Sequence, residues 1–349
     1  MKVFVDMQKL KAPNSGLGVF CKELGRALVR QNSGFDFTFL VPNKMPLDFG
    51  KVLKYIYLKP WHSLFIPNTN SFDIWHCTHQ DSRFFPSGNK AKILLTIHDL
   101  NFLYKYNGIK RRIKHFQLQR KISKAHTLAY ISAFTQQQVR ANFQIGNTPE
   151  HIVYNGIPTP AKPVKPEIVD GSDAFFFTIG IINPKKNTHV LPQLLTAFPN
   201  HKLLIAGKCD EAYSIRILAE AKAHNVTERV LFCGEISDAE KSWLFTNCSA
   251  FFFPSLAEGF GLPVVEAMQY GVPVFLSHQT ALPEIGGNVC YYWHSFNAAE
   301  MIQVVREGLN DFATHPEKSN ALKARASIYS WEKAAEQYLA IYKQMMSSP

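Results

Sequence analysis

Short apolar runs that alternate with helical segments constrain this chain more than any other feature. In the first half, apolar runs occupy residues 2–5, 35–41, 72–77 and 91–97, and a helical apolar period occupies 19–31. Strands that are apolar along their whole length are buried on both faces, which is typical of a parallel sheet covered by helices. The first half is therefore predicted to be a doubly wound α/β domain.

The same pattern restarts in the second half. Strands are expected at 174–181, 202–206, 230–233, 250–253 and 272–276, with helices at 188–197, 212–225, 238–248, 263–270, 298–309 and 330–346.

A proline-rich stretch separates the two series. Residues 157–166 hold four prolines, a density that interrupts helices and sheets. We predict an N-terminal domain at 1–160, a linker at 161–172 and a C-terminal domain at 173–329. A last helix at 330–349 is expected to pack back towards the N-terminal domain. In parallel sheets ligands bind at the carboxyl ends of the strands, so two such domains are expected to bind two ligands across a cleft.

Composition excludes several classes of protein. Of the 349 residues, 46% are hydrophobic and 19% charged, which is typical of a globular chain and not of a disordered one. No apolar run approaches the ~18 residues of a membrane helix, and Val3–Val5 is too short for a secretory signal. The six cysteines form no CxxC pair, so we expect reduced thiols in a cytoplasmic protein.

Charge is concentrated in the first half. Residues 1–160 carry 22 Lys and Arg against 8 Asp and Glu, although the whole chain has a net charge of only +11. No acidic residue lies between Asp99 and Glu150. One basic half indicates an anionic partner for that half.

Two carboxylates eight residues apart form the strongest motif. Glu258 and Glu266 flank Gly259-Phe260-Gly261-Leu262-Pro263, directly after the strand at 250–253. Proline favours a first helical turn, so Pro263 predicts a helix start near Leu262. The glycines allow backbone amides to approach a ligand, and a helix N-terminus favours an anion. The alternative is a glycine turn with two surface glutamates.

This segment resembles the E-x7-E motif of family 4 retaining glycosyltransferases (glycosyl transferases group 1), which have the GT-B fold. The resemblance covers nearly the whole chain, and the further matching segments lie at 178–187, 204–208, 234–237 and 282–287 in the second half and at 96–100, 131–132 and 153–157 in the first. It implies two Rossmann-like parallel-sheet domains that face each other across a cleft.

The resemblance also implies site residues. The catalytic residues would be Glu258, which contacts the transferred sugar, His98, and Lys186, which neutralises the leaving diphosphate. Glu266 would bind the ribose of the donor nucleotide. The other donor-binding residues would be Gly16, Gly18, Lys185, Lys208, Gly259, Phe260, Gly261 and Leu262.

Several of these residues also have a simpler interpretation. Lys185-Lys186 alone would be read as a solvated loop pair, Gly16-Leu17-Gly18 as a turn, and His98 as a structural histidine at a strand end. The resemblance is incomplete at Ile181-Ile182, where many family members have an arginine. Either Lys185 or Lys208 could then be the second cation beside Lys186. His76 and His79 could be acceptor-side residues or a metal pair, but no third ligand is in view, and we expect no metal.

The expected activity is that of a retaining, metal-independent hexosyltransferase. It would move a hexose from a nucleotide diphosphate sugar to a glycan or lipid-linked acceptor in cell-surface polysaccharide or lipopolysaccharide synthesis, without a cofactor. The alternatives are a sugar-nucleotide epimerase of the same fold and a degenerate nucleotide-sugar-binding protein.

The basic segment Lys105–Lys124 interleaves lysines and arginines with apolar residues. It is either a solvated helix face or a contact with an anionic membrane or acceptor, which would place the protein at the cytosolic face of the inner membrane. Nucleic acid is not expected, because no nucleic-acid motif accompanies the segment.

Overall fold

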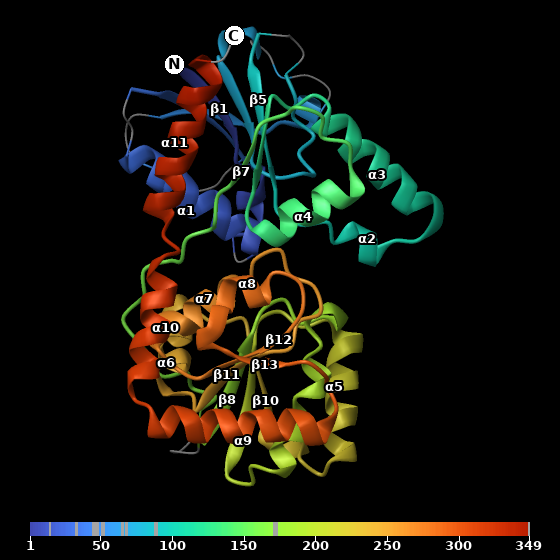
Figure 1. Ribbon diagram of the computed structural model, residues 1–349, viewed down its shortest axis with the longest axis vertical. Coiled ribbons are helices and arrows are strands. Elements are labelled where there is room, and N and C mark those ends of the chain that lie inside the picture. The colour runs from blue at the N-terminus through green and yellow to red at the C-terminus, as the bar shows by residue number, and fades with distance from the viewer. Residues whose placement is uncertain are drawn as a thin grey trace. The chain divides into compact units, whose positions relative to one another are not determined.

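The structure, a computed structural model, describes residues 1–13, 15–31, 34–43, 49, 53–63, 66, 69–86, 90–169 and 174–347. The chain divides into two compact units (Figure 1). Unit 1 comprises Met1–Gly156 and Tyr329–Pro349, and unit 2 comprises Ile157–Ile328. The described part of the predicted linker, 161–169, belongs to unit 2, where the Val164 N–H donates to the Ala239 carbonyl (3.1 Å). Residues 170–172 of that linker lie outside the described residues.

Unit 1 is built on one parallel sheet of seven strands in the order β3-β2-β1-β4-β5-β6-β7. Its strands are β1 (Lys2–Asp6), β2 (Asp36–Val41), β3 (Lys54–Tyr57), β4 (Ile74–Cys77), β5 (Lys92–Ile97), β6 (Thr127–Tyr130) and β7 (Glu150–Ile152). Its helices are α1 (Gly16–Arg30), α2 (Phe102–Lys105), α3 (Gly108–Ile122), α4 (Ala133–Asn142) and α11 (Trp331–Ser347).

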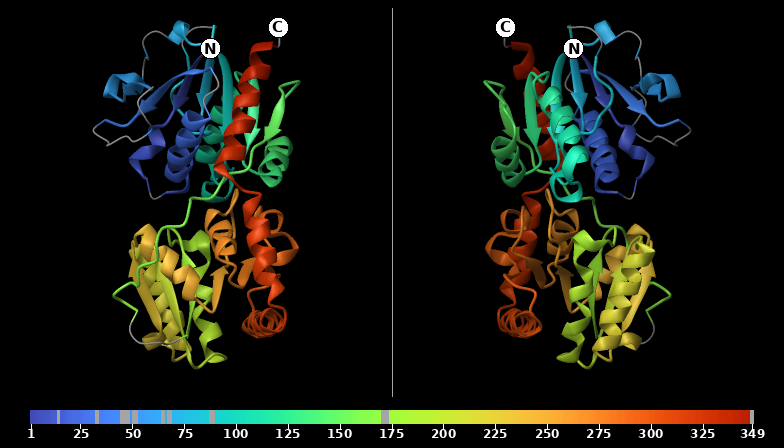
Figure 2. Two further views of the ribbon diagram at one scale, coloured as in Figure 1. Left: turned by 90° about the vertical axis from the view of Figure 1, so that its left-hand side faces the viewer. Right: turned by 90° about the vertical axis from the view of Figure 1, so that its right-hand side faces the viewer.

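Alternate residues of the unit 1 strands face two separate layers of core. Val3 and Val5 pack in the layer that contains α1 and α11, whereas Phe4 packs in the layer that contains α3 and α4. This is the two-sided burial expected of a parallel sheet. The C-terminal helix α11 lies beside α1 (Figure 2). Its Tyr338 and Tyr342 are fully buried in this layer.

Unit 2 is a second parallel sheet, of six strands, in the order β10-β9-β8-β11-β12-β13. The strands are β8 (Ala174–Ile179), β9 (His201–Ala206), β10 (Val230–Gly234), β11 (Ala250–Phe253), β12 (Val274–Ser277) and β13 (Tyr291–Trp293). The helices are α5 (Glu211–Ala223), α6 (Asp238–Asn247), α7 (Leu262–Tyr270), α8 (Leu282–Gly286), α9 (Ala298–Thr314) and α10 (Glu317–Ser327).

Neighbouring phenylalanines on β8 separate the two faces of this sheet. Phe176 packs with the layer that contains α5 and α9. Phe177 packs edge-on against Phe245 of α6, with ring centroids 5.1 Å apart. Both predicted doubly wound, Rossmann-like domains are therefore confirmed.

Two local predictions are wrong. The segment 188–197 is not one helix but two short 3-10 turns, Thr188–Val190 and Pro192–Thr196, because Pro192 has no N–H to continue the ladder. The interpretation of Gly16-Leu17-Gly18 as a turn before the helix is also wrong, because helix α1 already begins at Gly16, capped by the Ser15 hydroxyl. Among the helices of the described residues, none is long and apolar enough to cross a bilayer.

Candidate active site

The site in unit 2 begins with a tight turn after β8. The Asn183 side chain accepts a hydrogen bond from the Lys185 N–H (3.1 Å), Pro184 opens a 3-10 turn, and Asn187 closes it in the left-handed conformation (φ 55°). Asparagine tolerates this conformation better than most residues do. The turn lies at the carboxyl end of the strand, where parallel sheets bind ligands.

The turn brings two ammonium groups to the carboxylate of Glu258, more than 70 residues away. Lys186 Nζ lies 2.6 Å from Glu258 Oε1, and Lys185 Nζ lies 3.8 Å from Oε2. The Ser255 hydroxyl donates to the same Oε1 at 2.6 Å. The Lys186 ammonium also lies over the ring of Phe253, 4.6 Å from its centroid. Two cations and one carboxylate leave an excess positive charge, which suits an anionic ligand.

Backbone contacts hold the Glu258 loop in place. The Leu256 N–H donates to the Lys185 carbonyl (2.9 Å), which ties this loop to the lysine turn. The Glu258 N–H donates to the Thr280 hydroxyl (2.9 Å), and the Ser277 hydroxyl donates to the Ser255 carbonyl. The carboxylate is thereby positioned from three different strand ends.

Burial and charge have opposite effects on the pKa values of Glu258 and Lys186. Burial raises the pKa of Glu258, but the ammonium groups of Lys186 and Lys185 and the hydrogen bonds outweigh it, so that pKa lies below its ordinary value. Burial lowers the pKa of Lys186, and the Glu258 carboxylate offsets this only in part. The Glu258 side chain is 12% exposed and that of Lys186 is 14% exposed, so water screens their attraction only weakly.

Helix α7 starts where Pro263 predicts, and its N-cap must be glycine. Gly261 has φ 101°, and a β-carbon there would lie 2.8 Å from Leu282 Cδ2. Gly259, Phe260 and Gly261 are buried, and Leu262 is half-buried. These residues lead into the positive end of the helix dipole, which starts four residues after Glu258.

Glu266 lies one turn into α7 and has its own cation. Its Oε1 is 2.9 Å from Lys241 Nζ of α6, and the same ammonium lies 3.1 Å from Asp238 Oδ1. Burial raises the pKa of Glu266, and Lys241 offsets part of that rise. The two carboxylates of the motif therefore pair with different lysines. Sequence reasoning missed Lys241, Ser255 and Thr280, and no local pattern marks Lys241.

Lys208 follows β9 with an exposed side chain, and its carbonyl accepts from the Ile182 N–H (2.9 Å). The second ammonium beside Glu258 is that of Lys185.

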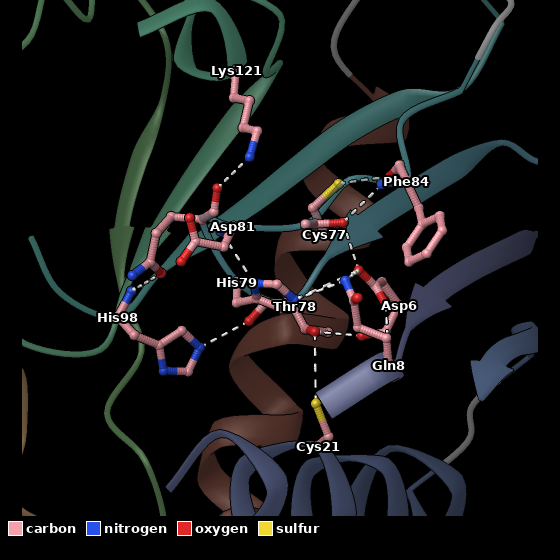
Figure 3. Close-up of polar contacts among 12 residues, drawn as sticks. Asp6, Gln8, Cys21, Cys77, Thr78, His79, Asp81, Phe84, His98 and Lys121 are labelled. Atoms are coloured by element: carbon pink, nitrogen blue, oxygen red, sulfur yellow. Dashed lines mark hydrogen bonds and ion pairs between the residues drawn. The ribbon is translucent and has the colours of Figure 1, made fainter. Parts of the chain in front are cut away.

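His98, in unit 1, is a buried neutral histidine at the carboxyl end of β5. Its Nε2–H donates to the Thr78 carbonyl (2.8 Å), and its backbone N–H donates to Gln80 Oε1 (3.1 Å) (Figure 3). The Thr78 bond assigns the proton to Nε2 and leaves Nδ1 as the acceptor. Burial lowers the pKa of His98 to about 4.

Gly16 and Gly18 form the first turn of α1. The Ser15 hydroxyl accepts from the Gly18 N–H (3.1 Å), and a side chain on Gly18 would overlap the Ala12 carbonyl oxygen. Gly16 and Gly18 therefore belong to a helix N-terminus and not to a flexible loop, and a helix N-terminus favours an anion.

His76 is a structural residue, contrary to the suggestion that it faces an acceptor or a metal. It is fully buried, with Nδ1 2.7 Å from the Tyr342 hydroxyl and Nε2 2.9 Å from Thr96 Oγ1. His79 is also buried, beside Gln8, and its Nδ1 accepts from the Asp81 N–H (3.1 Å) (Figure 3). In the described parts of the chain no three His, Cys, Asp or Glu side chains come together as a metal site would require.

Known proteins resemble this chain in sequence and in fold. Residues 163–327 match the family described as Glycosyl transferases group 1. The serotype-specific mannosyltransferase WbdA of Escherichia coli is 29% identical over 183 residues, which are 50% of this chain and 22% of that protein. The chain thus spans about a fifth of the length of WbdA. The O-antigen chain mannosyltransferase B of Escherichia coli is 22% identical over an alignment that covers 98% of this chain and 100% of that protein.

Among solved structures, Anabaena HepE in complex with UDP and glucose superposes with a TM-score of 0.78 at 16% identity, covering 99% of this chain and 100% of its own. That likeness supports the expected GT-B fold of two Rossmann-like domains.

Proposed function

We propose that this protein is a hexosyltransferase, because residues 163–327 match the family described as Glycosyl transferases group 1. It would transfer a hexose from a nucleotide diphosphate sugar to a hydroxyl of a glycan or glycolipid acceptor, in the synthesis of a cell-surface polysaccharide or lipopolysaccharide. The observation that carries the proposal is the cluster of Lys185, Lys186 and Glu258 beside the N-terminus of α7. The mannosyltransferase relatives favour transfer over the epimerase and binding-protein alternatives.

The cluster can stabilise a departing diphosphate without a metal. Negative charge develops on the leaving oxygens as the sugar–phosphate bond breaks, and preorganised cations and amides stabilise it. Lys186 and Lys185 supply the cations, and the N-terminus of α7 supplies amides and a dipole. The Glu258 carboxylate holds Lys186 in place and accepts hydrogen bonds from sugar hydroxyls.

Glu266 is proposed to bind the ribose hydroxyls of the donor. Its carboxylate pairs with the Lys241 ammonium, which offsets part of the rise that burial causes in the pKa of Glu266. In unit 1, His98 presents a neutral ring whose Nδ1 can accept a hydrogen bond from a sugar hydroxyl.

We propose retention of the anomeric configuration by front-side attack. The bond between the anomeric carbon and the phosphate oxygen breaks, and a bond from the acceptor oxygen to the same carbon forms on the same face. The proton of the acceptor hydroxyl passes to the departing phosphate oxygen. Glu258, bound to two ammonium groups and the Ser255 hydroxyl, is a hydrogen-bonding residue in this scheme and not a nucleophile.

A panel of nucleotide sugars tests the proposal. Incubation of the full chain with UDP-, GDP-, ADP- and dTDP-hexoses should release nucleoside diphosphate with one donor, faster when an acceptor is present. Interconversion of one sugar nucleotide into another would instead mark an epimerase. Binding without turnover under all conditions would mark a binding protein and refute the transferase.

A specific surface supports the expected contact with an anionic membrane. On α3, Ile109, Ile113 and Phe116 lie on one face and are 77%, 51% and 63% exposed. Tyr104 of α2 is 63% exposed. These side chains are flanked by basic residues, among them Lys105, Lys110, Arg111, Arg112 and Arg120. Exposed apolar side chains beside lysine and arginine are typical of helices that lie on anionic lipid.

Vesicle flotation tests this contact. The chain should float with vesicles that contain phosphatidylglycerol and not with pure phosphatidylcholine vesicles. Ile113→Ser combined with Phe116→Ser should abolish flotation. The matched control is Ile215→Ser on α5, which is 64% exposed but lies in the other unit. Equal flotation of all three proteins would leave α3 as a solvated helix.

A further inference from the structure

Unit 1 contains a cavity that the proposed donor site does not use. It has a volume of about 190 Å³ and is formed by the residues after β4 and β5 together with α2 and α3. The charged side chains that line it are Lys105, Lys114, Lys121, Asp81 and Asp99. The carboxyl ends of two neighbouring parallel strands meet at this cavity, and ligands bind at such ends.

Gln80 connects the cavity to His98. Its Oε1 accepts from the His98 N–H (3.1 Å), and its Nε2 donates to the Asp99 carbonyl (3.0 Å). The Gln80 carbonyl in turn accepts from Lys121 Nζ (2.8 Å), whose side chain extends towards this loop in Figure 3. Gln80 therefore both lines the cavity and accepts a hydrogen bond from His98, the histidine that is proposed to contact the sugar.

The cavity carries more positive charge than negative. Three ammonium groups line it against two carboxylates. One carboxylate, Asp81, already faces Lys114, with Oδ1 3.5 Å from Nζ. Burial lowers the pKa of Lys121, and the Asp81 carboxylate offsets this only in part, so the ammonium gains from a further negative neighbour. The sequence adds no acidic residue between Asp99 and Glu150 to balance these lysines.

The size and the other lining groups limit the ligand. A volume of about 190 Å³ is below the ~300–1,000 Å³ of pockets that enclose drug-sized ligands, so a whole nucleotide sugar does not fit. One sugar ring or one phosphate group fits better. Asn101 and Gln117 add amides, and the carboxylates can accept from sugar hydroxyls.

We propose that this cavity binds a phosphate group carried by the acceptor. The inference rests on the proposed function, because it names the class of acceptor as phosphorylated carbohydrate. The face of α3 that lines the cavity (Lys114, Gln117, Leu118 and Lys121) differs from the exposed apolar face proposed to contact lipid. The phosphate could belong to a phosphorylated sugar or to a diphosphate that links the glycan to a lipid.

Calorimetric titration of the full chain tests the inference. The two probes are mannose 6-phosphate and a farnesyl-diphosphate-linked monosaccharide. Lys105→Met and Lys121→Met should each raise Kd for the bound probe by about tenfold or more, because each removes a charged donor. Lys124→Met, just beyond α3 and outside the cavity, makes the same charge change and should leave Kd unaltered.

The outcomes separate the two proposals and the two phosphate sources. Tighter binding of the farnesyl probe indicates a lipid-linked diphosphate, and tighter binding of mannose 6-phosphate indicates a phosphorylated sugar. If neither probe binds, or if Lys124→Met weakens binding as much as Lys105→Met, the inference is overturned. Because Lys105 is exposed, its variant stays informative even if Lys121→Met fails to fold. Donor turnover with unphosphorylated acceptors would then still support the proposed function.

Discussion

Replacing Lys186 by methionine removes the ammonium that contacts Glu258 and leaves that carboxylate buried. The Nζ–Oε1 distance is 2.6 Å, and neither side chain is more than 14% exposed. Breaking a buried pair from one side costs about 3–5 kcal/mol. Lys185, 3.8 Å from the other carboxylate oxygen, retains part of the compensation, so we expect the lower end of that range. For a unit of this size, the melting temperature should fall by roughly 6–12 °C.

Activity should fall independently of stability. If Lys186 neutralises the leaving diphosphate, its loss should lower kcat by about 10²–10³-fold, as the loss of one preorganised donor does in other enzymes. Diphosphate release with saturating donor, measured well below the melting temperature, separates this effect from unfolding. Lys185→Met is the matched control for stability only, because its side chain is 34% exposed and its pairing should contribute under about 1 kcal/mol. Its activity should also fall, because Lys185 is the second cation of the proposed site.

The double variant Lys186→Met, Glu258→Gln makes the test sharper. Removing both charges also removes the unpaired buried carboxylate, so most of the lost stability should return while activity stays low. If the double variant melts no higher than Lys186→Met, the electrostatic explanation of the stability loss is wrong. If Lys186→Met turns over donor at near the wild-type rate, its role at the leaving group is wrong.

Three further predictions concern acid stability, backbone geometry and donor affinity. Burial lowers the pKa of His76 to about 3 and that of His98 to about 4, whereas the unfolded histidines titrate near ~6.5. Protons then bind the unfolded chain preferentially. For each histidine, the free energy of unfolding should therefore be about 2 kcal/mol lower at pH 5 than at pH 8. Urea midpoints at both pH values measure this, and a flat profile would contradict it. Gly261→Ala should destabilise more than Gly146→Ala, because Gly261 has the less tolerated φ (101° against 64°) and a neighbour within 3 Å of the added carbon. Equal melting temperatures would contradict both reasons. Glu266→Gln should raise the donor Kd about tenfold by removing a charged acceptor, without a matching change in kcat, and an unaltered Kd in calorimetry would remove Glu266 from the donor site.

Local patterns predicted the helix boundaries only where a residue enforces them. Pro263 marked the start of α7 correctly because proline suits a first helical turn, and the glycine before it can adopt φ 101°. The run 188–197 failed because its apolar spacing suits a helix but Pro192 breaks the ladder. Gly16 and Gly18 suggested a loop, yet the Ser15 cap starts the helix at Gly16.

The candidate site was predictable as a set of residues but not as a set of pairs. Glu258 and Lys186 stand out because each follows an apolar strand, and all carboxyl ends of a parallel sheet lie along one edge. The pairing of Lys241 with Glu266 carries no local signal, because it depends on α6 packing beside α7. Sequence spacing also left open which cation accompanies Lys186, and the turn geometry selects Lys185 beside Glu258.

The histidines show most clearly which features follow from the sequence pattern and which from tertiary packing. His76 lies within β4 and His98 directly follows β5, and apolar patterning alone does not show what either ring contacts. The packing of α11 against the sheet places Tyr342, 266 residues away, at 2.7 Å from His76 and closes that histidine into the core. The His98 ring instead packs edge-on against Phe20 and donates to the Thr78 carbonyl. Apolar periodicity is a local property, so it determined two doubly wound domains by itself. Side-chain partners depend on strand order and on which helix covers which face, and only the tertiary structure decides those.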